Sequence, residues 1–208
     1  MADKFAVFVE GLTGLEDMAA LRKSVRLEAV RALNTAAERG RTMGARAIRD
    51  EINFPAAYLS PGQKRLYVSK KATRTDLEAR IRARARPTSL ARFTTGATAI
   101  NKAGVTVSVQ PGKARFMKRA FLVRLKAGAG AIETRSNLGL AVRLKPGETL
   151  RNKNEVRRLD SNLYLLYGPS VDQVFRARDG SGVAEDISPE IADILEKEFL
   201  RLVELGRG

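Results

Sequence analysis

Among the residue types that do chemistry, the acidic pair Asp76 and Glu78 has the most suggestive spacing. Two positions apart on an extended strand, the two side chains would share one face and could together hold Mg²⁺. Arg80 and Arg82 would share that face and compete for the same carboxylate oxygens. One hypothesis is therefore a metal-dependent nuclease site at Asp76 and Glu78, and the other is a solvated charged face.

Several other catalytic chemistries are removed by the absence of two residue types. The 208 residues include no histidine and no cysteine, which removes the usual general base, nucleophilic triads, zinc ligand sets and a disulfide framework. Gly128 and Gly130 form a G-x-G pattern, but Glu133 stands where a dinucleotide-binding fingerprint needs glycine. These glycines predict an exposed loop tip. We expect no enzymatic activity, no cofactor and no metal.

The charge of the chain is large and uneven. The formal net charge is +15, yet residues 170–208 hold five Lys/Arg and nine Asp/Glu, a net charge of −4 that leaves +19 for the rest. This asymmetry predicts a basic core domain over residues 1–176 and an acidic C-terminal helical segment over 177–208. A basic body favours polyanions or acidic protein surfaces as partners. No apolar run reaches the length of a membrane span, and the N-terminus does not resemble a secretory signal.

Two clusters of basic residues are candidate contact surfaces. In the first, arginines alternate with apolar residues over 77–86, which predicts a half-buried strand whose exposed face carries Arg80, Arg82, Arg84 and Arg86. Neighbouring guanidinium groups would lie about 6.6–6.8 Å apart and repel each other. The row is either a solvated edge strand protected by charge or a face that binds phosphate or carboxylate.

The second cluster lies in the segment 110–119, which we expect to be an exposed loop, and comprises Lys113, Arg115, Lys118 and Arg119. Only 6% of the residues are aromatic, which argues against a protein that stacks single-stranded bases. Any nucleic-acid contact would be made to the phosphate backbone.

Hydrophobic periodicity predicts an α+β fold. A strand is expected at 4–11, and an amphipathic helix with a small-residue seam containing Gly40 from about 13 to 50. We expect this long N-terminal helix to pack tightly on a mainly antiparallel sheet or on a neighbouring subunit. Further strands are predicted at 105–109, 120–125, 140–144 and 163–167, with exposed loops at 110–119 and 126–139 and a polar connection at 145–158. A C-terminal helix is expected with Ser188 as its N-cap and Pro189 at its first position.

The sequence "LYLLYGPSVDQVF" at 163–175 predicts a strand, a sharp corner and a short helix. Gly168 tolerates backbone angles that other residues avoid, and Pro169 fixes its own φ. Ser170 would cap the helix, with Gln173 completing an S-x-x-Q capping box.

The stretch "LYGPSVDQVF" (166–175) is similar to the signature of the phage minor tail protein Z family, the tail completion proteins of long-tailed phages. Other segments resemble the family in matching order, over about residues 25–176: "RALNTAAERGRTMGARAIRDEI" (31–52), "RPTSLARF" (86–93), "KAGVTVSV" (102–109) and "KRAFLVRL" (118–125).

The resemblance implies a structural virion protein of the tail or neck, made in the host cytoplasm. Family members act late in tail assembly, near the head-proximal end, where head–tail joining or DNA positioning depends on them. The expected partners are other copies of this chain in a six-fold ring, tail terminator, tail tube or head–tail connector proteins, and genome DNA in the lumen. An alternative function is a non-catalytic nucleic-acid-binding protein that contacts the phosphate backbone.

Overall fold

The computed structural model describes residues 23–96, 100, 102–125, 137–149, 156–160, 162–177 and 182–205. The chain forms two compact units, and neither is continuous in sequence. Unit 1 comprises Met1–Ile48, Leu59–Arg84 and Asp172–Gly208, and unit 2 comprises Arg49–Tyr58 and Ala85–Val171. The division predicted between 1–176 and 177–208 stays a prediction.

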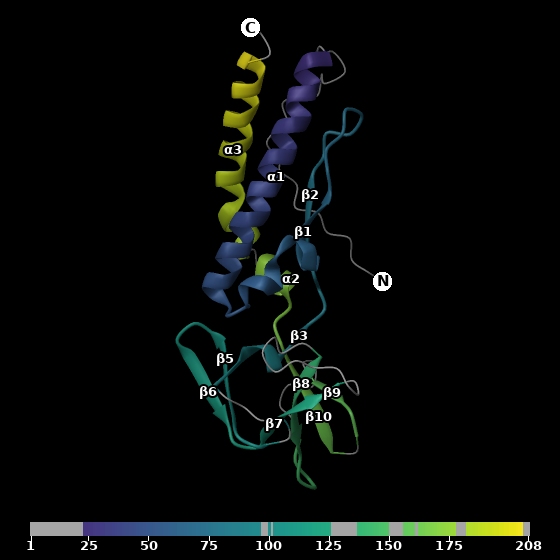
Figure 1. The fold of residues 1–208 in the computed structure, drawn as a ribbon, viewed down its shortest axis with the longest axis vertical. Helices are drawn as coiled ribbons and strands as arrows, with labels where there is room; N and C mark the ends of the chain where they lie inside the picture. Colours follow the sequence, from purple (N-terminus) through teal and green to yellow (C-terminus); the bar gives the residue numbers. More distant parts are fainter. Residues whose placement is uncertain are drawn as a thin grey trace. The chain divides into compact units, whose positions relative to one another are not determined.

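Unit 1 contains all but the last turn of helix α1 (Lys23–Glu51), all but the first residue of α2 (Val171–Phe175), the whole of α3 (Val183–Leu205) and the hairpin β1–β2 (Figure 1). Strands β1 (Leu66–Lys70) and β2 (Arg80–Ala83) pair antiparallel. Two short 3₁₀ helices, η2 (Ala56–Leu59) and η3 (Pro61–Gln63), precede β1.

The small residues of α1 let its neighbours come close. A Cβ placed on Gly40 would lie 2.6 Å from Cδ1 of Ile191 in α3 and 3.3 Å from Cδ1 of Ile81 in β2. One turn on, a Cβ on Gly44 would lie 2.9 Å from the ring of Phe175 in α2. The expected tight packing of the N-terminal helix is thereby confirmed, and it packs on both a sheet and α3.

Unit 2 contains two antiparallel sheets. In the larger one, β3 (Thr88–Ser89), β10 (Leu163–Gly168), β8 (Leu138–Arg143) and β7 (Ala120–Arg124) are neighbours in that order, and β9 (Val156–Arg158) also pairs with β10. The smaller sheet has the order β4 (Thr94–Thr95), β5 (Val105–Gln110) and β6 (Lys113–Met117). A short 3₁₀ helix, η4 (Leu90–Phe93), joins β3 to β4.

The core of unit 2 follows the alternation of its strands. Leu122 in β7, Leu140 in β8 and Leu165 in β10 are each almost fully buried. β8 departs from this alternation, because all its residues except Arg143 are buried and both faces of the strand are therefore covered. The predicted strands at 105–109, 120–125, 140–144 and 163–167 are confirmed as β5, β7, β8 and β10. Together with the long helices α1 and α3, these strands confirm the predicted α+β class.

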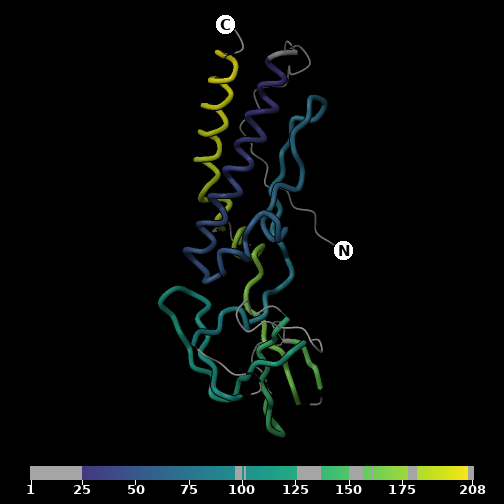
Figure 2. The backbone as a smooth tube through the Cα atoms, in the orientation of Figure 1, coloured from purple at the N-terminus to yellow at the C-terminus, as the bar shows by residue number. Residues whose placement is uncertain are grey.

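Three predictions of local structure are wrong. The segment 110–119 is no loop, because β6 pairs with β5 and Pro111 and Gly112 make the turn between them, with Gly112 at φ +72°. Figure 2 shows this hairpin in teal. The strand expected over 77–86 shrinks to β2, because its partner β1 offers only five residues to pair with.

The third wrong prediction is the start of the C-terminal helix. α3 begins at Val183, and Pro189 lies inside it. Ser188 is therefore not its N-cap. The carbonyl of Gly182 accepts the amides of Glu185 and Asp186 at 3.0 and 3.4 Å, so the first turn starts there. The buried Val183, Ala184 and Ile187 continue the apolar stripe of Ile191 and Leu195.

Some predicted segments fall outside the described residues. These are the strand at 4–11, the start of the N-terminal helix, most of the loop at 126–139 and the middle of the connection at 145–158. The last residues of that connection form β9.

Candidate functional site

The corner, defined as Gly168 and Pro169, joins β10 to α2 where two separate segments meet. Tyr167 and Gly168 pair with Ser89 and Thr88 of β3. A Cβ on Gly168 would lie 2.9 Å from Cδ2 of Leu90 and 3.3 Å from the ring of Phe93. Gly168 does not have a positive φ, so its predicted role as a residue with unusual backbone angles is wrong. A glycine is needed there because the neighbouring side chains approach closely.

Ser170 is buried directly before α2, and Gln173 is exposed on that helix. Their roles in a capping box stay predictions. The amide of Asp172 donates a 3.1 Å hydrogen bond to the carbonyl of Arg84, and the Asp172 carboxylate pairs with Arg176 one turn later. The first bond ties the start of α2 to the residue after β2, and the ion pair bridges the short helix itself.

An aromatic cluster supports the corner within unit 2. Phe54 stacks on Tyr58 with ring centroids 5.3 Å apart, and it contacts Phe93 at 5.4 Å. The Tyr58 hydroxyl and the Thr88 hydroxyl lie 3.1 Å apart, both buried. The guanidinium of Arg92 lies 4.7 Å from the centre of the Tyr58 ring, within the range of a cation–π contact. The segment 86–93 is therefore held from one side by the corner and from another by these rings.

The structure does not place the four predicted arginines in one row. Arg80 and Arg82 belong to β2, where Arg80 is half-buried and Arg82 is exposed. Arg84 follows the strand, and its amide donates to the carbonyl of Arg65 at 2.9 Å. Arg86 is exposed but belongs to unit 2. Their role in partner or DNA contact stays a prediction.

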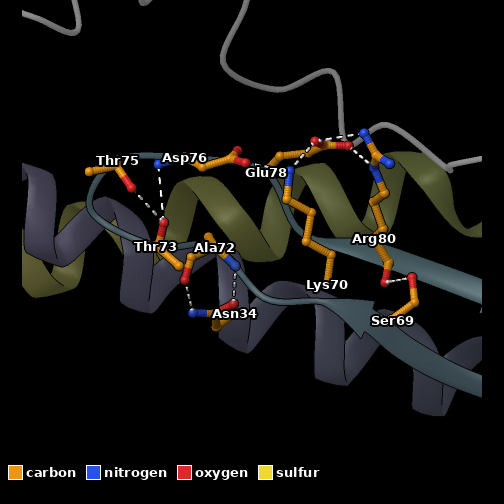
Figure 3. Close-up of polar contacts among 9 residues, drawn as sticks. All are labelled: Asn34, Ser69, Lys70, Ala72, Thr73, Thr75, Asp76, Glu78 and Arg80. Atoms are coloured by element: carbon orange, nitrogen blue, oxygen red, sulfur yellow. Dashed lines mark hydrogen bonds and ion pairs between the residues drawn. The ribbon is translucent and has the colours of Figure 1, made fainter.

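Arg80 is also part of a four-residue ionic network, the Lys70 cluster, formed by Lys70, Asp76, Glu78 and Arg80 (Figure 3). The Lys70 ammonium lies 2.5 Å from the Asp76 carboxylate and 2.6 Å from the Glu78 carboxylate. Arg80 donates to both oxygens of Glu78 through Nε and Nη2.

The pKa values within the Lys70 cluster follow from these contacts. Hydrogen bonds from Arg80, and then from Lys70, lower the pKa of Glu78. Hydrogen bonds to Asp76, and then to Glu78, raise the pKa of Lys70. The carboxylates of the magnesium hypothesis are thus engaged by cations of their own chain. No group of three or more acidic residues that could hold a metal occurs among the described residues.

The loop that carries Asp76 is fixed to α1 by Asn34. Its side-chain oxygen accepts the amide of Ala72 at 2.8 Å, and its side-chain nitrogen donates to the carbonyl of Ala72 at 3.1 Å. The Thr73 hydroxyl accepts the amide of Asp76 at 3.1 Å (Figure 3). Sequence reasoning missed both Asn34 and Lys70, because their roles depend on β1, which the sequence pattern did not predict.

The second basic cluster is brought together by the β5–β6 hairpin. Lys113 and Arg115 are exposed on β6, and Lys118 and Arg119 are exposed in the turn that follows. Arg119 pairs with Glu148 at 2.8 Å, which lowers the pKa of that carboxyl. Lys113, Arg115 and Lys118 form no ion pair with any described residue of unit 2. These three are called the basic strand surface below.

Comparison of the chain with protein-family models, with curated proteins and with solved structures found no match. In the part of the chain that the structure covers, no helix combines the length and the apolar character of a membrane span.

Proposed function

We propose that this chain is a structural virion protein that completes the head-proximal end of a phage tail by forming a ring with copies of itself. The proposal starts from the resemblance of 166–175 and 86–93 to the tail completion proteins. One observation of the structure supports it: these two segments are in direct contact, through the pairing of β3 with β10 and the packing of Gly168 against Leu90 and Phe93. The two segments that carry the resemblance are therefore neighbours in the folded chain.

The charge of unit 2 is consistent with this role. Of the net charge of +15, the residues of unit 2 carry +11 and those of unit 1 carry +4. A basic unit of this kind attracts either acidic surfaces of tail tube, terminator or connector proteins, or DNA in a lumen. A ring uses heterologous contacts that close by rotation, and six-fold symmetry would match a tail tube.

The test is complementation of a phage that lacks this chain. The wild-type chain supplied from a plasmid is expected to restore particles with heads joined to tails, counted by electron microscopy, and to be present in the purified particles. A chain with Gly168→Ala and Pro169→Ala is expected to restore few joined particles. Far-UV circular dichroism on the purified variant checks that it is folded. Normal joining and infectivity without the chain would contradict the proposal.

A second candidate, a nucleic-acid-binding protein without catalysis, is favoured by the exposure of Lys113, Arg115 and Lys118. Contacts to phosphate release counterions, so affinity for duplex DNA would fall steeply with salt and would be similar for different sequences. Titration of a labelled duplex at several salt concentrations distinguishes the two candidates. Failure to bind DNA at low salt eliminates the second one.

A further inference from the structure

The outer strand of the smaller sheet of unit 2 has a charged surface that forms no ion pair with the described residues of that unit. β6 is the edge strand of the order β4–β5–β6, and four of its five residues are exposed. Lys113 and Arg115 are two residues apart, so they point to the same face, about 6.6–6.8 Å from each other. The four residue steps from Lys113 to Met117 span about 13 Å, and Lys118 lies at the far end of the strand, in the turn that follows.

The solvent side of α3 has the opposite charge. The helix contains seven acidic and two basic residues. Four of its exposed acids recur every three or four residues and form a continuous stripe, here called the acidic stripe: Asp186, Glu190, Asp193 and Glu196. None of the four forms an ion pair with another described residue of unit 1, whereas Glu198 nearer the buried face pairs with Arg201.

The two surfaces match in length and spacing. The ten residue steps from Asp186 to Glu196 rise about 15 Å, close to the length of β6. Neighbouring acids on one helix face have Cβ atoms about 5–6 Å apart, close to the separation of Lys113 and Arg115. Each surface by itself brings like charges together, so a partner of opposite charge relieves repulsion on both.

We propose that the basic strand surface of one copy binds the acidic stripe of α3 in a second copy. The contact joins two different surfaces, so it is heterologous and repeats from copy to copy, which is the arrangement that produces a ring or a filament. The inference rests on the proposed function in one respect, since the ring of that proposal requires such a repeating contact. The occupant of the hairpin is thus another copy of this chain and not DNA.

The test uses charge reversal on the full chain. The hairpin variant carries Lys113→Glu and Arg115→Glu, and the helix variant carries Glu190→Lys and Asp193→Lys. Sedimentation velocity at about 0.1 M salt, where the Debye length is about 10 Å, measures association. A control variant with Arg46→Glu and Lys102→Glu makes the same change in net charge as the hairpin variant, at exposed positions outside both surfaces.

The wild-type chain and the control are expected to associate. Each reversal variant is expected to be monomeric, because like charges then face each other. An equal mixture of the two variants is expected to associate again, because each acidic hairpin finds a basic helix on the other variant. Recovery on mixing requires contact between copies. Raising the salt to about 1 M, where the Debye length is about 3 Å, is expected to abolish wild-type association.

Three results would overturn the inference: a wild-type chain that is monomeric at low salt, reversal variants that associate as the wild type does, or a mixture that stays monomeric. If the hairpin variant lost DNA binding but kept association, the basic strand surface would be a DNA contact instead. These measurements need no phage. The proposed contact can therefore be disproved while complementation still succeeds, and the contact can be confirmed while complementation fails.

Discussion

Glu78 accepts hydrogen bonds from both Arg80 and Lys70, yet 23% of its side chain remains exposed. The two hydrogen bonds lower the pKa of Glu78. The remaining exposure limits how much these contacts add to the free energy of unfolding, because water and salt screen exposed ion pairs. Exposed ion pairs typically contribute about 0–1 kcal/mol. The Lys70 cluster therefore holds the loop between β1 and β2 in place more than it stabilises unit 1 as a whole.

Replacement Glu78→Gln tests this contribution through pH. Because the pKa of Glu78 is lowered in the folded state, its stabilisation is complete above the ordinary glutamate pKa of about 4.3 and is lost as the pH falls through the folded value. The variant is expected to lose less than about 1 kcal/mol of unfolding free energy at pH 7. It is also expected to lose less stability than the wild type between about pH 5 and pH 3.

Urea denaturation at a series of pH values measures both effects. Glu38→Gln is a suitable control, because within the described part of the chain Glu38 forms a single ion pair, with Lys71 at 3.2 Å. If the loss of unfolding free energy at acid pH were the same in Glu78→Gln as in the wild type, Glu78 would make no pH-dependent contribution to stability.

At the scale of elements, the packing of α1 depends on the absence of side chains at Gly40 and Gly44. Glycine in a helix interior usually costs about 1 kcal/mol relative to alanine. Here the missing Cβ makes room for the ring of Phe175 and for Ile191, both almost fully buried. The cost in helix propensity is offset by the close approach of α2 and α3.

Gly44→Ala is therefore expected to destabilise unit 1, although alanine is the better helix former. The new Cβ would lie 2.9 Å from Cε2 of Phe175, a rigid ring that must move away as a whole. Overpacking of this kind costs about 1–3 kcal/mol, which exceeds the gain in propensity. Gly62→Ala, with no atom within 4 Å of the new Cβ, is the matched control and is expected to be close to neutral. Thermal unfolding compares the two, and a stabilised Gly44→Ala would contradict the packing described.

The elements that sequence patterns predicted are those with one strong signal. β5, β7, β8 and β10 combine apolar residues with turn residues at their ends, and α1 has a clear apolar period. β6 could not be predicted from its pattern, because a strand exposed on both faces shows no apolar alternation. The start of α3 was misplaced because Ser188–Pro189 is a strong local start signal, and the burial of Val183 and Ile187 outweighs it.

At the scale of the whole molecule, the candidate site residues were predicted by type but not by arrangement. Charge and turn residues pointed to Lys113, Arg115 and Gly168 from the sequence alone. Tertiary pairing decided which charges are neutralised, since Arg80 is engaged by Glu78 and Arg119 by Glu148. It also decided that Gly168 serves close packing, which depends on Leu90 and Phe93, almost eighty residues away in sequence.

A chain that ends at Ala177 tests how unit 1 depends on α3. The truncation removes four large buried side chains, and each contributes about 1.5–3 kcal/mol by leaving water: Val183, Ile187, Ile191 and Leu195. Their sum is comparable with the total stability of a domain, about 5–15 kcal/mol. We expect α1 to lose helicity in circular dichroism and to regain it when a peptide of residues 182–205 is added. Unchanged cooperative unfolding would instead favour 1–176 as an independent core domain.

The chain passes between its two units four times, after Ile48, Tyr58, Arg84 and Val171. During synthesis, every segment of unit 2 is therefore translated before the last segment of unit 1. The nascent polypeptide carries Gly40 and Gly44 in α1 without their contacts to α2 and α3 until those helices are made. A stop codon near residue 172 would thus release a protein that has every segment of unit 2 but lacks the closing helix of unit 1.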